Sequence, residues 1–306
     1  MKYNWGIIGH EKQLNLLEQD ISSGNISHAY LLIGPNSIGK YTVAKKIAGI
    51  LQCENDFCHE CSTCIQIEKG SHIDTIEFKD DKESLKIEEV RALVERLNMT
   101  GQSKYKIVLL QSVERMTVEA SNSFLKILEE PPKNTIFIMT ANNIRLILPT
   151  VISRVRVVKF EIVSANYLTE KLKTLYADRT ADEITKASLL ALGKTGKAIK
   201  LMENPEVFSD YMALYHKIKN FIEVKNVADR FAYVEEIVED DSKIDLFFNL
   251  LKTVLRTKIL EGDANIERNI DSVLKIYEAS VFLKKNVNSR LVLENLMLSL
   301  GVKIKK

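Results

Sequence analysis

Net charge, long apolar runs and proline are all scarce in this sequence. Its 43 basic and 41 acidic residues leave a net charge of +2, which excludes a polybasic coat for nucleic acid and restricts any such contact to a local patch. No stretch approaches the roughly 20 apolar residues that a membrane span needs, and Met1–Gly6 contains no apolar signal-peptide region. We therefore expect a soluble, cytoplasmic protein that has no membrane partner.

The few prolines and glycines indicate how the chain is divided. All five prolines lie at or before Pro205, and Gly262 and Gly301 are the only glycines in the last hundred residues. A length of 306 residues predicts two domains or three, at roughly 150 residues each. Apolar residues at helical spacing continue beyond Pro205, so residues 206–306 are predicted to form helices throughout.

Short apolar runs alternate with helical patterns in the first half of the chain. Runs such as Ala29–Ile33 are fully apolar and end at turn residues, which is typical of strands buried within a sheet. One helical pattern ends at Pro131, because proline lacks the N–H that a helix needs. The alternation predicts an α/β domain with a parallel sheet covered on both faces. The expected strands are 29–33, 75–78, 106–110, 135–140 and 155–160, and the expected helices include 10–23, 87–97 and 118–130.

A loop with the sequence GPNSIGK, Gly34–Lys40, connects the first apolar run to a helix. It fits the first seven positions of the P-loop, in which backbone N–H groups hold phosphates and the lysine reaches the β- and γ-phosphates. The next position should carry a Ser or Thr hydroxyl for Mg²⁺, but it is Tyr41, and Thr42 comes one residue late. A helix turns by about 100° per residue, so Thr42 cannot simply substitute. The candidate nucleotide-contacting residues of this degenerate loop are Gly34, Gly39, Lys40 and Thr42, and whether ATP or ADP binds stays open.

The acidic residues of an ATPase site are also missing. In P-loop ATPases the next central strand ends in an Asp that holds Mg²⁺, usually followed by a Glu that activates water. Here the strand 106–110 is followed by Gln111 and Ser112, which supply neither a charge nor a general base. Glu114 is offset by two positions, and we interpret it as an exposed charge that opens the next helix. These departures point away from hydrolysis.

All four cysteines fall within twelve residues, at Cys53, Cys58, Cys61 and Cys64. Four thiolates at this close spacing suit a tetrahedral, structural Zn²⁺ site with no open position for water. An iron–sulfur cluster is the competing interpretation, but the Cys-Pro that follows such a run in ferredoxins is absent. His59 could replace one sulfur. We predict a zinc site, and a disulfide scaffold is disfavoured because such scaffolds are small, secreted and rich in cysteine throughout.

Several segments resemble subunits of bacterial clamp loaders, and together they cover nearly the whole chain. They are the run before the phosphate loop (28–35), the four-cysteine spacing, LEEPP at 128–132, PTVISR at 149–154 and NVNSRLVLE at 286–294. In combination they are similar to the delta-prime subunits of the DNA polymerase III clamp loader, which belong to the AAA+ class. That family typically supplies the non-hydrolysing stator of the loader, in agreement with the missing acids, and a zinc loop is one of its features.

The resemblance implies three domains. They are an AAA+ P-loop domain over residues 1–162 with a zinc-binding insertion at 53–64, a small helical lid over 163–205, and an all-α collar over 206–306 that builds a five-subunit ring. The implied partners are the gamma/tau and delta subunits of a hetero-pentamer, with the sliding clamp and primed DNA reached through the complex. The implied function is ATP-dependent placement of the clamp on DNA, with hydrolysis performed by the partners.

The resemblance also implies roles for two polar residues. Family members carry Ser-Arg-Cys where this chain has Ser153, Arg154 and Val155. Arg154 would be an arginine finger offered in trans to the ATP site of a neighbouring subunit, where its permanent charge suits the developing phosphate charge. Asn142, after the strand 135–140, sits where the family has its polar sensor.

Two other functions stay open on the residues alone. The first is an active AAA+ ATPase of the gamma/tau type, which would use Lys40 and a relocated acid; the residues Gln111 and Ser112 argue against it. The second is a zinc-dependent DNA-binding module. It is disfavoured because Lys69 is the only close basic neighbour of the cysteines and the other flanking charges are acidic.

Overall fold

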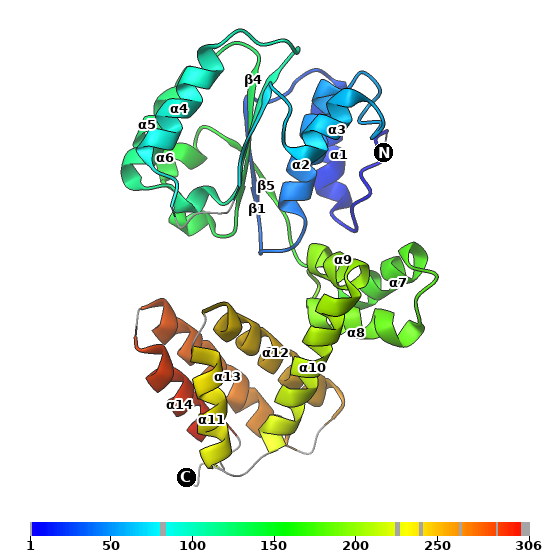
Figure 1. The fold of residues 1–306 in the computed structure, drawn as a ribbon, viewed down its shortest axis with the longest axis vertical. Helices are drawn as coiled ribbons and strands as arrows, with labels where there is room; N and C mark the ends of the chain where they lie inside the picture. The colour runs from blue at the N-terminus through cyan, green and yellow to red at the C-terminus, as the bar shows by residue number, and fades with distance from the viewer. Residues whose placement is uncertain are drawn as a thin grey trace. The chain divides into compact units, whose positions relative to one another are not determined.

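The computed structural model describes residues 2–79, 84–223, 227–238, 241–262, 265–285 and 287–300. Asn286 and Gly301, which the sequence patterns above include, lie outside these ranges. The chain divides into two compact units, the first comprising Met1–Lys171 with Gly193–Lys197, and the second Leu172–Leu192 with Ala198–Lys306 (Figure 1). The division into three domains stays a prediction. Within the described ranges, no helix combines the length and apolar character needed to cross a membrane.

The first unit is built on a five-stranded parallel sheet in the order β2-β3-β4-β1-β5. The strands match the expected ones closely, and only the last is shorter than predicted. Their bounds are β1 (Ala29–Ile33), β2 (Thr75–Phe78), β3 (Lys106–Leu110), β4 (Thr135–Ala141) and β5 (Arg156–Lys159). The predicted α/β fold with a parallel sheet is therefore confirmed.

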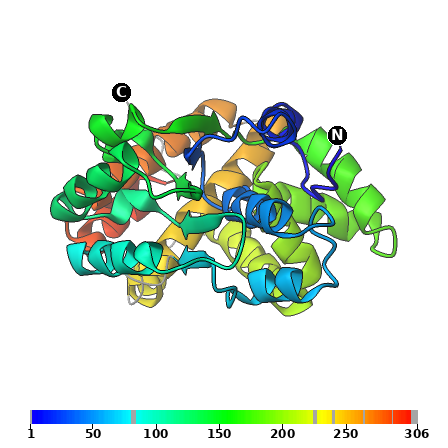
Figure 2. The same ribbon diagram turned by 90° about the horizontal axis from the view of Figure 1, so that it is seen from above.

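Helices cover both faces of this sheet (Figures 1 and 2). Alternate residues of a strand point to opposite faces, so Tyr30 and Leu32 enter one apolar core while Leu31 and Ile33 enter the other. The first core is closed by α1 (Glu11–Ser22), α2 (Lys40–Gln52) and α3 (Ser62–Lys69), and the second by α4 (Ile87–Asn98), α5 (Val118–Glu129) and α6 (Pro149–Ile152). Two 3-10 turns, η1 (Val113–Arg115) and η2 (Ile144–Leu146), follow β3 and β4.

Local sequence explains where the site-forming helices begin and end. Gly39 precedes α2 with a φ of 93°, a left-handed conformation that glycine adopts without strain. Thr117 caps α5 by accepting a hydrogen bond from the Ala120 N–H, and the helix ends at Glu129, just before Pro131. Gly34 lies against the end of β5, where an added Cβ would be 2.3 Å from the Phe160 carbonyl oxygen.

The second unit is helical, as predicted for residues 206–306. Its core is filled by α12 residues such as Phe247 and Leu251, both buried. Arg230 of α11 is buried as well, and its guanidinium donates to the carbonyls of Met297 (2.8 Å) and Leu300 at the end of α14. The remaining helices of the chain are α7 (Ala165–Leu175), α8 (Ala181–Ala191), α9 (Thr195–Glu203), α10 (Pro205–Glu223), α11 (Val227–Val238), α12 (Asp241–Leu260), α13 (Ile266–Lys284) and α14 (Ser289–Ser299).

Candidate functional site

Lys40, the lysine of the phosphate loop, is turned back onto its own loop. Its Nζ donates to the carbonyl oxygens of Gly34 and Pro35, both at 2.7 Å, and to Asn142 Oδ1 at 3.0 Å. The residue is only 7% exposed. Burial lowers the pKa of Lys40 to about 8, although the nearby Glu114 carboxylate acts in the opposite direction. The ammonium therefore already has three acceptors, which a phosphate would have to displace.

Tyr41 occupies the position where a P-loop needs a small hydroxyl for Mg²⁺. Its hydroxyl instead donates to Glu77 Oε2 of β2 at 2.8 Å. The Glu77 side chain is 4% exposed and is also 3.4 Å from Lys45 Nζ. Burial and the Glu77 carboxylate both raise the pKa of Tyr41, so this phenol stays protonated. Thr42, the other candidate hydroxyl, is exposed in the first turn of α2.

The segment Gly193–Lys197 rests on the phosphate loop within the first unit. The Lys197 N–H donates to the Ser37 carbonyl oxygen at 3.0 Å, and Thr195 Oγ1 donates to the Ile38 carbonyl oxygen at 3.0 Å. Gly196 permits this approach, because an added Cβ would be 2.9 Å from the Ser37 oxygen. The start of α9 is therefore held against the loop by hydrogen bonds to two carbonyl oxygens of the loop backbone.

The end of β3 carries no carboxylate at the positions of the ATPase acids. Gln111 and Ser112 follow the strand, and Ser112 has a left-handed backbone with a φ of 55°. Our interpretation of Glu114 as an exposed charge was wrong, since its side chain is half-buried. Glu114 Oε1 accepts the Asn142 N–H at 2.8 Å, while Oε2 is buried and has no hydrogen-bond partner within the described ranges. Asn142 thus connects Glu114 to Lys40.

The four cysteines converge on one point at the end of α2. Their Sγ atoms all lie within 4.8 Å of one another, and Cys53 Sγ is 3.8 Å from both Cys58 Sγ and Cys61 Sγ. Burial opposes ionisation of the Cys53 thiol, but backbone N–H groups of Cys58 and Asn55 donate to its sulfur, and its pKa is lowered. These four side chains could hold a metal ion, as the spacing predicts.

The surroundings of the cysteines fix the loop and exclude one alternative ligand. His59 Nδ1 is 2.6 Å from Glu68 Oε1, so His59 is paired outside the group of four sulfurs. Phe57 packs its ring on Gly49 of α2, where an added Cβ would be 2.2 Å from the ring. Asp56, Phe57 and His59 all have positive φ values. The backbone of the cysteine loop therefore turns sharply between the sulfur-bearing residues.

Arg154 follows α6 and is held by three acceptors. Nη2 pairs with Glu129 Oε1 of α5 at 2.6 Å. Nη1 donates to the Thr150 carbonyl oxygen at 2.9 Å and to Ser153 Oγ at 3.2 Å. The side chain of Arg154 is 35% exposed, so it is accessible to a partner.

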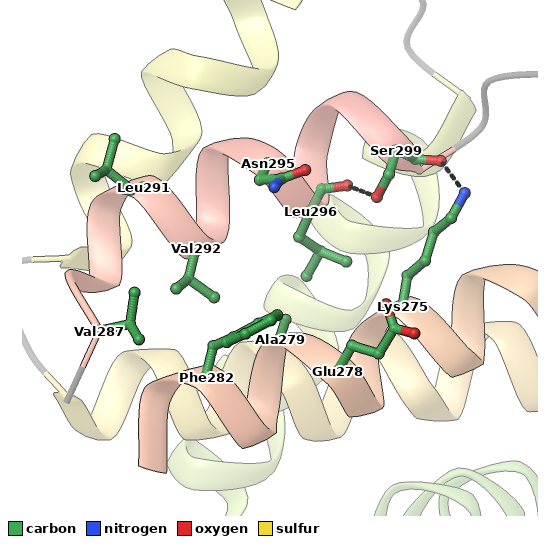
Figure 3. Close-up of a pocket in the computed structure, with 10 residues that line it drawn as sticks. All are labelled: Lys275, Glu278, Ala279, Phe282, Val287, Leu291, Val292, Asn295, Leu296 and Ser299. Carbon is green, nitrogen blue, oxygen red and sulfur yellow. Dashed lines mark hydrogen bonds between the residues drawn. The ribbon is translucent and has the colours of Figure 1, made fainter. Parts of the chain in front are cut away.

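The second unit carries exposed apolar surface on α13 and α14. Ile266, Ile270, Leu274 and Tyr277 recur at helical spacing along one face of α13, and they are 42–69% exposed. Between α13 and α14 lies a pocket of about 340 Å³, into which Phe282, Val287 and Val292 project (Figure 3). Surface of this kind marks an interaction site in soluble proteins.

Several residues of these sites were not among the candidates predicted from the sequence. Glu77 could have been noticed as an acid within an otherwise apolar strand pattern. The glycines at Gly193 and Gly196 indicate a turn between two helical patterns, but nothing in the sequence connects this turn to the phosphate loop. Glu129 lies in the LEEPP motif, yet its pairing with Arg154 spans 25 residues.

The chain is similar to several subunits of DNA polymerase III. The family described as "DNA polymerase III, delta subunit" matches residues 9–164. The chain is 28% identical over 272 residues to the DNA polymerase III subunit gamma of Buchnera aphidicola subsp. Acyrthosiphon pisum, covering 83% of this chain and 73% of the relative. It is 25% identical to the DNA polymerase III subunit delta' of Bacillus subtilis, covering 94% of each. A gamma subunit-related protein of Thermotoga maritima shares the fold, with a TM-score of 0.51, 20% identity and coverage of 92% of this chain and 97% of that one.

Proposed function

The chain belongs to the DNA polymerase III delta subunit family, and from this premise we propose that it is the non-hydrolysing, delta-prime-type subunit of a clamp loader. In this role it orders the loader while gamma/tau subunits hydrolyse ATP, and it offers Arg154 to the ATP site of a neighbour. The loader would place the sliding clamp on primed DNA in the cytoplasm. The implied assembly is a hetero-pentamer with gamma/tau and delta subunits.

One observation carries the non-hydrolysing assignment: the phosphate loop keeps its frame but lacks the groups that act on phosphate. Hydrolysis needs a metal-holding acid and a water-activating group close to the γ-phosphate. The end of β3 supplies Gln111 and Ser112 instead, and Tyr41 is bound to Glu77. Lys40 is bound by its own loop and by Asn142. ATP or ADP binding to Gly34, Gly39, Lys40 and Thr42 would require this closed loop to open.

A second candidate function, an active ATPase of the gamma/tau type, is favoured by Glu114. This residue is close enough to Lys40 to affect its pKa, and its Oε2 has no hydrogen-bond partner. It could serve as a relocated acid. Glu114→Gln separates the two functions, because it would abolish turnover by an active ATPase and leave a non-hydrolysing subunit unchanged.

The proposed chemical contribution of the chain is the Arg154 guanidinium. An arginine finger stabilises charge on the transferring phosphoryl group and is worth about 10³- to 10⁵-fold in kcat where it has been measured in GTPases. The test is the DNA-stimulated ATPase of a loader reconstituted from this chain with its gamma/tau and delta subunits. Arg154→Ala should assemble normally and lower kcat. Unchanged rates would remove Arg154 from the mechanism.

We further propose that the cysteine group holds a structural Zn²⁺. Four thiolates bound at about 2.3 Å in a tetrahedron around one ion are about 3.8 Å apart. Three of the Sγ–Sγ separations, Cys53–Cys58, Cys53–Cys61 and Cys58–Cys64, are 3.8–3.9 Å and agree with this. An iron–sulfur cluster attaches its thiolates to different iron atoms, so their sulfurs would be farther apart. Four thiolate ligands leave no position for water, and the role is structural.

The helices of residues 206–306 are proposed to form the collar, after an AAA+ domain (1–162) and a lid (163–205). The exposed stripe on α13 supports this role, because a helix that leaves such a stripe uncovered needs a partner. Leu274→Asp should weaken assembly with gamma/tau and delta, measured by light scattering after size-exclusion chromatography. Lys275→Asp is a less suitable control, since Lys275 is paired with Asp271. Lys219→Asp, at an exposed position of α10, introduces the same charge on another helix and is the control.

A further inference from the structure

The guanidinium of Arg154 is oriented by a carboxylate from another helix. Nη1 has two N–H groups, and both have acceptors, the Thr150 carbonyl and Ser153 Oγ. These two acceptors belong to the same turn as Arg154, so they move with it. Glu129, at the last position of α5, is the one polar contact of this group from a separate element among the described residues.

The Glu129 contact has little value as a source of stability. The side chains of Arg154 and Glu129 are 35% and 49% exposed, and ion pairs at such exposed sites contribute little to stability. Its geometric effect is larger. Arginine has many rotamers, and contacts at both Nη1 and Nη2 exclude most of them.

The contacts also determine which N–H groups are left for a partner. Among the residues that the structure describes, nothing accepts a hydrogen bond from Arg154 Nε, and Nη2 is engaged only by its ion pair with Glu129. Nε and Nη2 form one edge of the guanidinium, and two N–H groups on one edge match two oxygens of a phosphate. Because both N–H groups of Nη1 are occupied, the Nε–Nη2 edge is the one that a phosphate would bind.

We propose that Glu129 is a positioning residue for Arg154, which holds the guanidinium so that its Nε–Nη2 edge can receive the phosphate oxygens at the neighbouring ATP site. The inference rests on the proposed trans role of Arg154. Glu129 touches no substrate itself, and it acts by fixing the orientation of the arginine. A small misplacement of a group that acts on the transition state can cost up to about 100-fold in rate.

The test compares variants of this chain in the complete, reconstituted loader by the kcat and KM of DNA-stimulated ATP hydrolysis. Glu129→Ala should lower kcat by about three- to tenfold with little change in KM, and by less than Arg154→Ala. Glu129→Gln keeps an acceptor for Nη2 and should restore most of the rate. Glu130→Ala removes the adjacent exposed glutamate and should behave as the unmodified chain.

A double variant separates positioning from an indirect effect on folding or assembly. Glu129→Ala should have no further effect in an Arg154→Ala background, because a positioning residue acts only through the group it positions. Additive losses would overturn the proposal, as would a higher rate for Glu129→Ala, which would mean that the carboxylate masks the arginine. A normal rate for Glu129→Ala together with a low rate for Arg154→Ala overturns this inference alone. Normal rates for both variants overturn the trans role of Arg154 as well.

Discussion

The two ends of α2 lie next to two sites, of which one has all the residues its chemistry needs and the other lacks some of them. The phosphate loop leads into the helix at Gly39, and the cysteine loop begins where the helix ends, at Cys53. All four sulfurs of the cysteine loop are present and converge. The phosphate loop keeps its glycines and Lys40, but the acids that would complete it are missing.

The difference follows from how the two sites are assembled. The metal ligands lie within twelve residues, so one short segment builds the whole site. Phosphate chemistry needs groups from the loop and from the ends of other strands, which are distant in the sequence. Gln111 and Ser112 supply no acid at the end of β3, while the packing of the loop is retained. The backbone of such a site can therefore be retained where the side chains that act on phosphate are missing.

The largest expected loss of stability comes from removing one ligand of the four-cysteine site. Cys64 is fully buried, and Cys64→Ser should lose the metal and destabilise the first unit by about 3 kcal/mol or more, because binding of a structural metal contributes directly to folding. Metal content by mass spectrometry and thermal unfolding with and without chelator test this. The unmodified chain should hold one zinc and lose stability with chelator, whereas Cys64→Ser should not respond to chelator. A chain whose unfolding is unaffected by chelator would contradict a structural metal.

Burial of Lys40 in the phosphate loop should make the free energy of unfolding depend on pH. The pKa of Lys40 is about 8 in the folded protein and near 10.4 in an unfolded chain, so between these values the unfolded chain binds more protons. Stability should therefore rise as pH increases from about 8 to 10.4. Lys197, also with a pKa of about 8, contributes in the same direction. Lys40→Met should reduce the rise by about 1–3 kcal/mol, after allowance for solvent screening, in denaturant titrations across this range. Equal slopes for the two chains would show that Lys40 is not buried as described.

A smaller effect is expected at Gly49, in the helix that joins the two sites. Gly49→Ala places a methyl group about where the Phe57 ring lies. Overpacking costs about 1–3 kcal/mol, and the better helix propensity of alanine returns up to about 1 kcal/mol, so a net loss of about 1–2 kcal/mol is expected. Phe57→Ala should make Gly49→Ala neutral or stabilising in a thermal unfolding cycle, and additive losses would argue against the contact.

The smallest effect is expected at Tyr41. Tyr41→Phe removes the hydrogen bond to the buried Glu77 but leaves the ring and the Lys45 ion pair. We expect a loss of about 1 kcal/mol in urea unfolding, the usual contribution of one hydrogen bond, because Lys45 still pairs with Glu77. Tyr41→Thr restores the P-loop pattern and should still give no ATP turnover, because Gln111 and Ser112 are unchanged. Turnover by this variant would show that Tyr41 alone had disabled the site.

The sequence was most informative where the cause is local. Apolar runs predicted the five strands to within one or two residues, most clearly for β1, β3 and β4, whose burial on both faces leaves a clear pattern. Cysteine spacing predicted the sulfur cluster. Contacts between distant segments left no such pattern. Lys40 meets Asn142 across 102 residues, and Thr195 meets Ile38 across 157. Glu114 was misinterpreted for the same reason, because only the fold brings η1 beside the end of β4.

The most direct test of the central claim is ATP turnover by the purified chain alone, in the presence of Mg²⁺. The missing acids and the closed loop around Lys40 predict no hydrolysis above the buffer rate, with no change in Lys40→Ala or Glu114→Gln. Magnesium-dependent turnover that disappears in both variants would contradict the non-hydrolysing role and assign the chain to the active ATPases of its family.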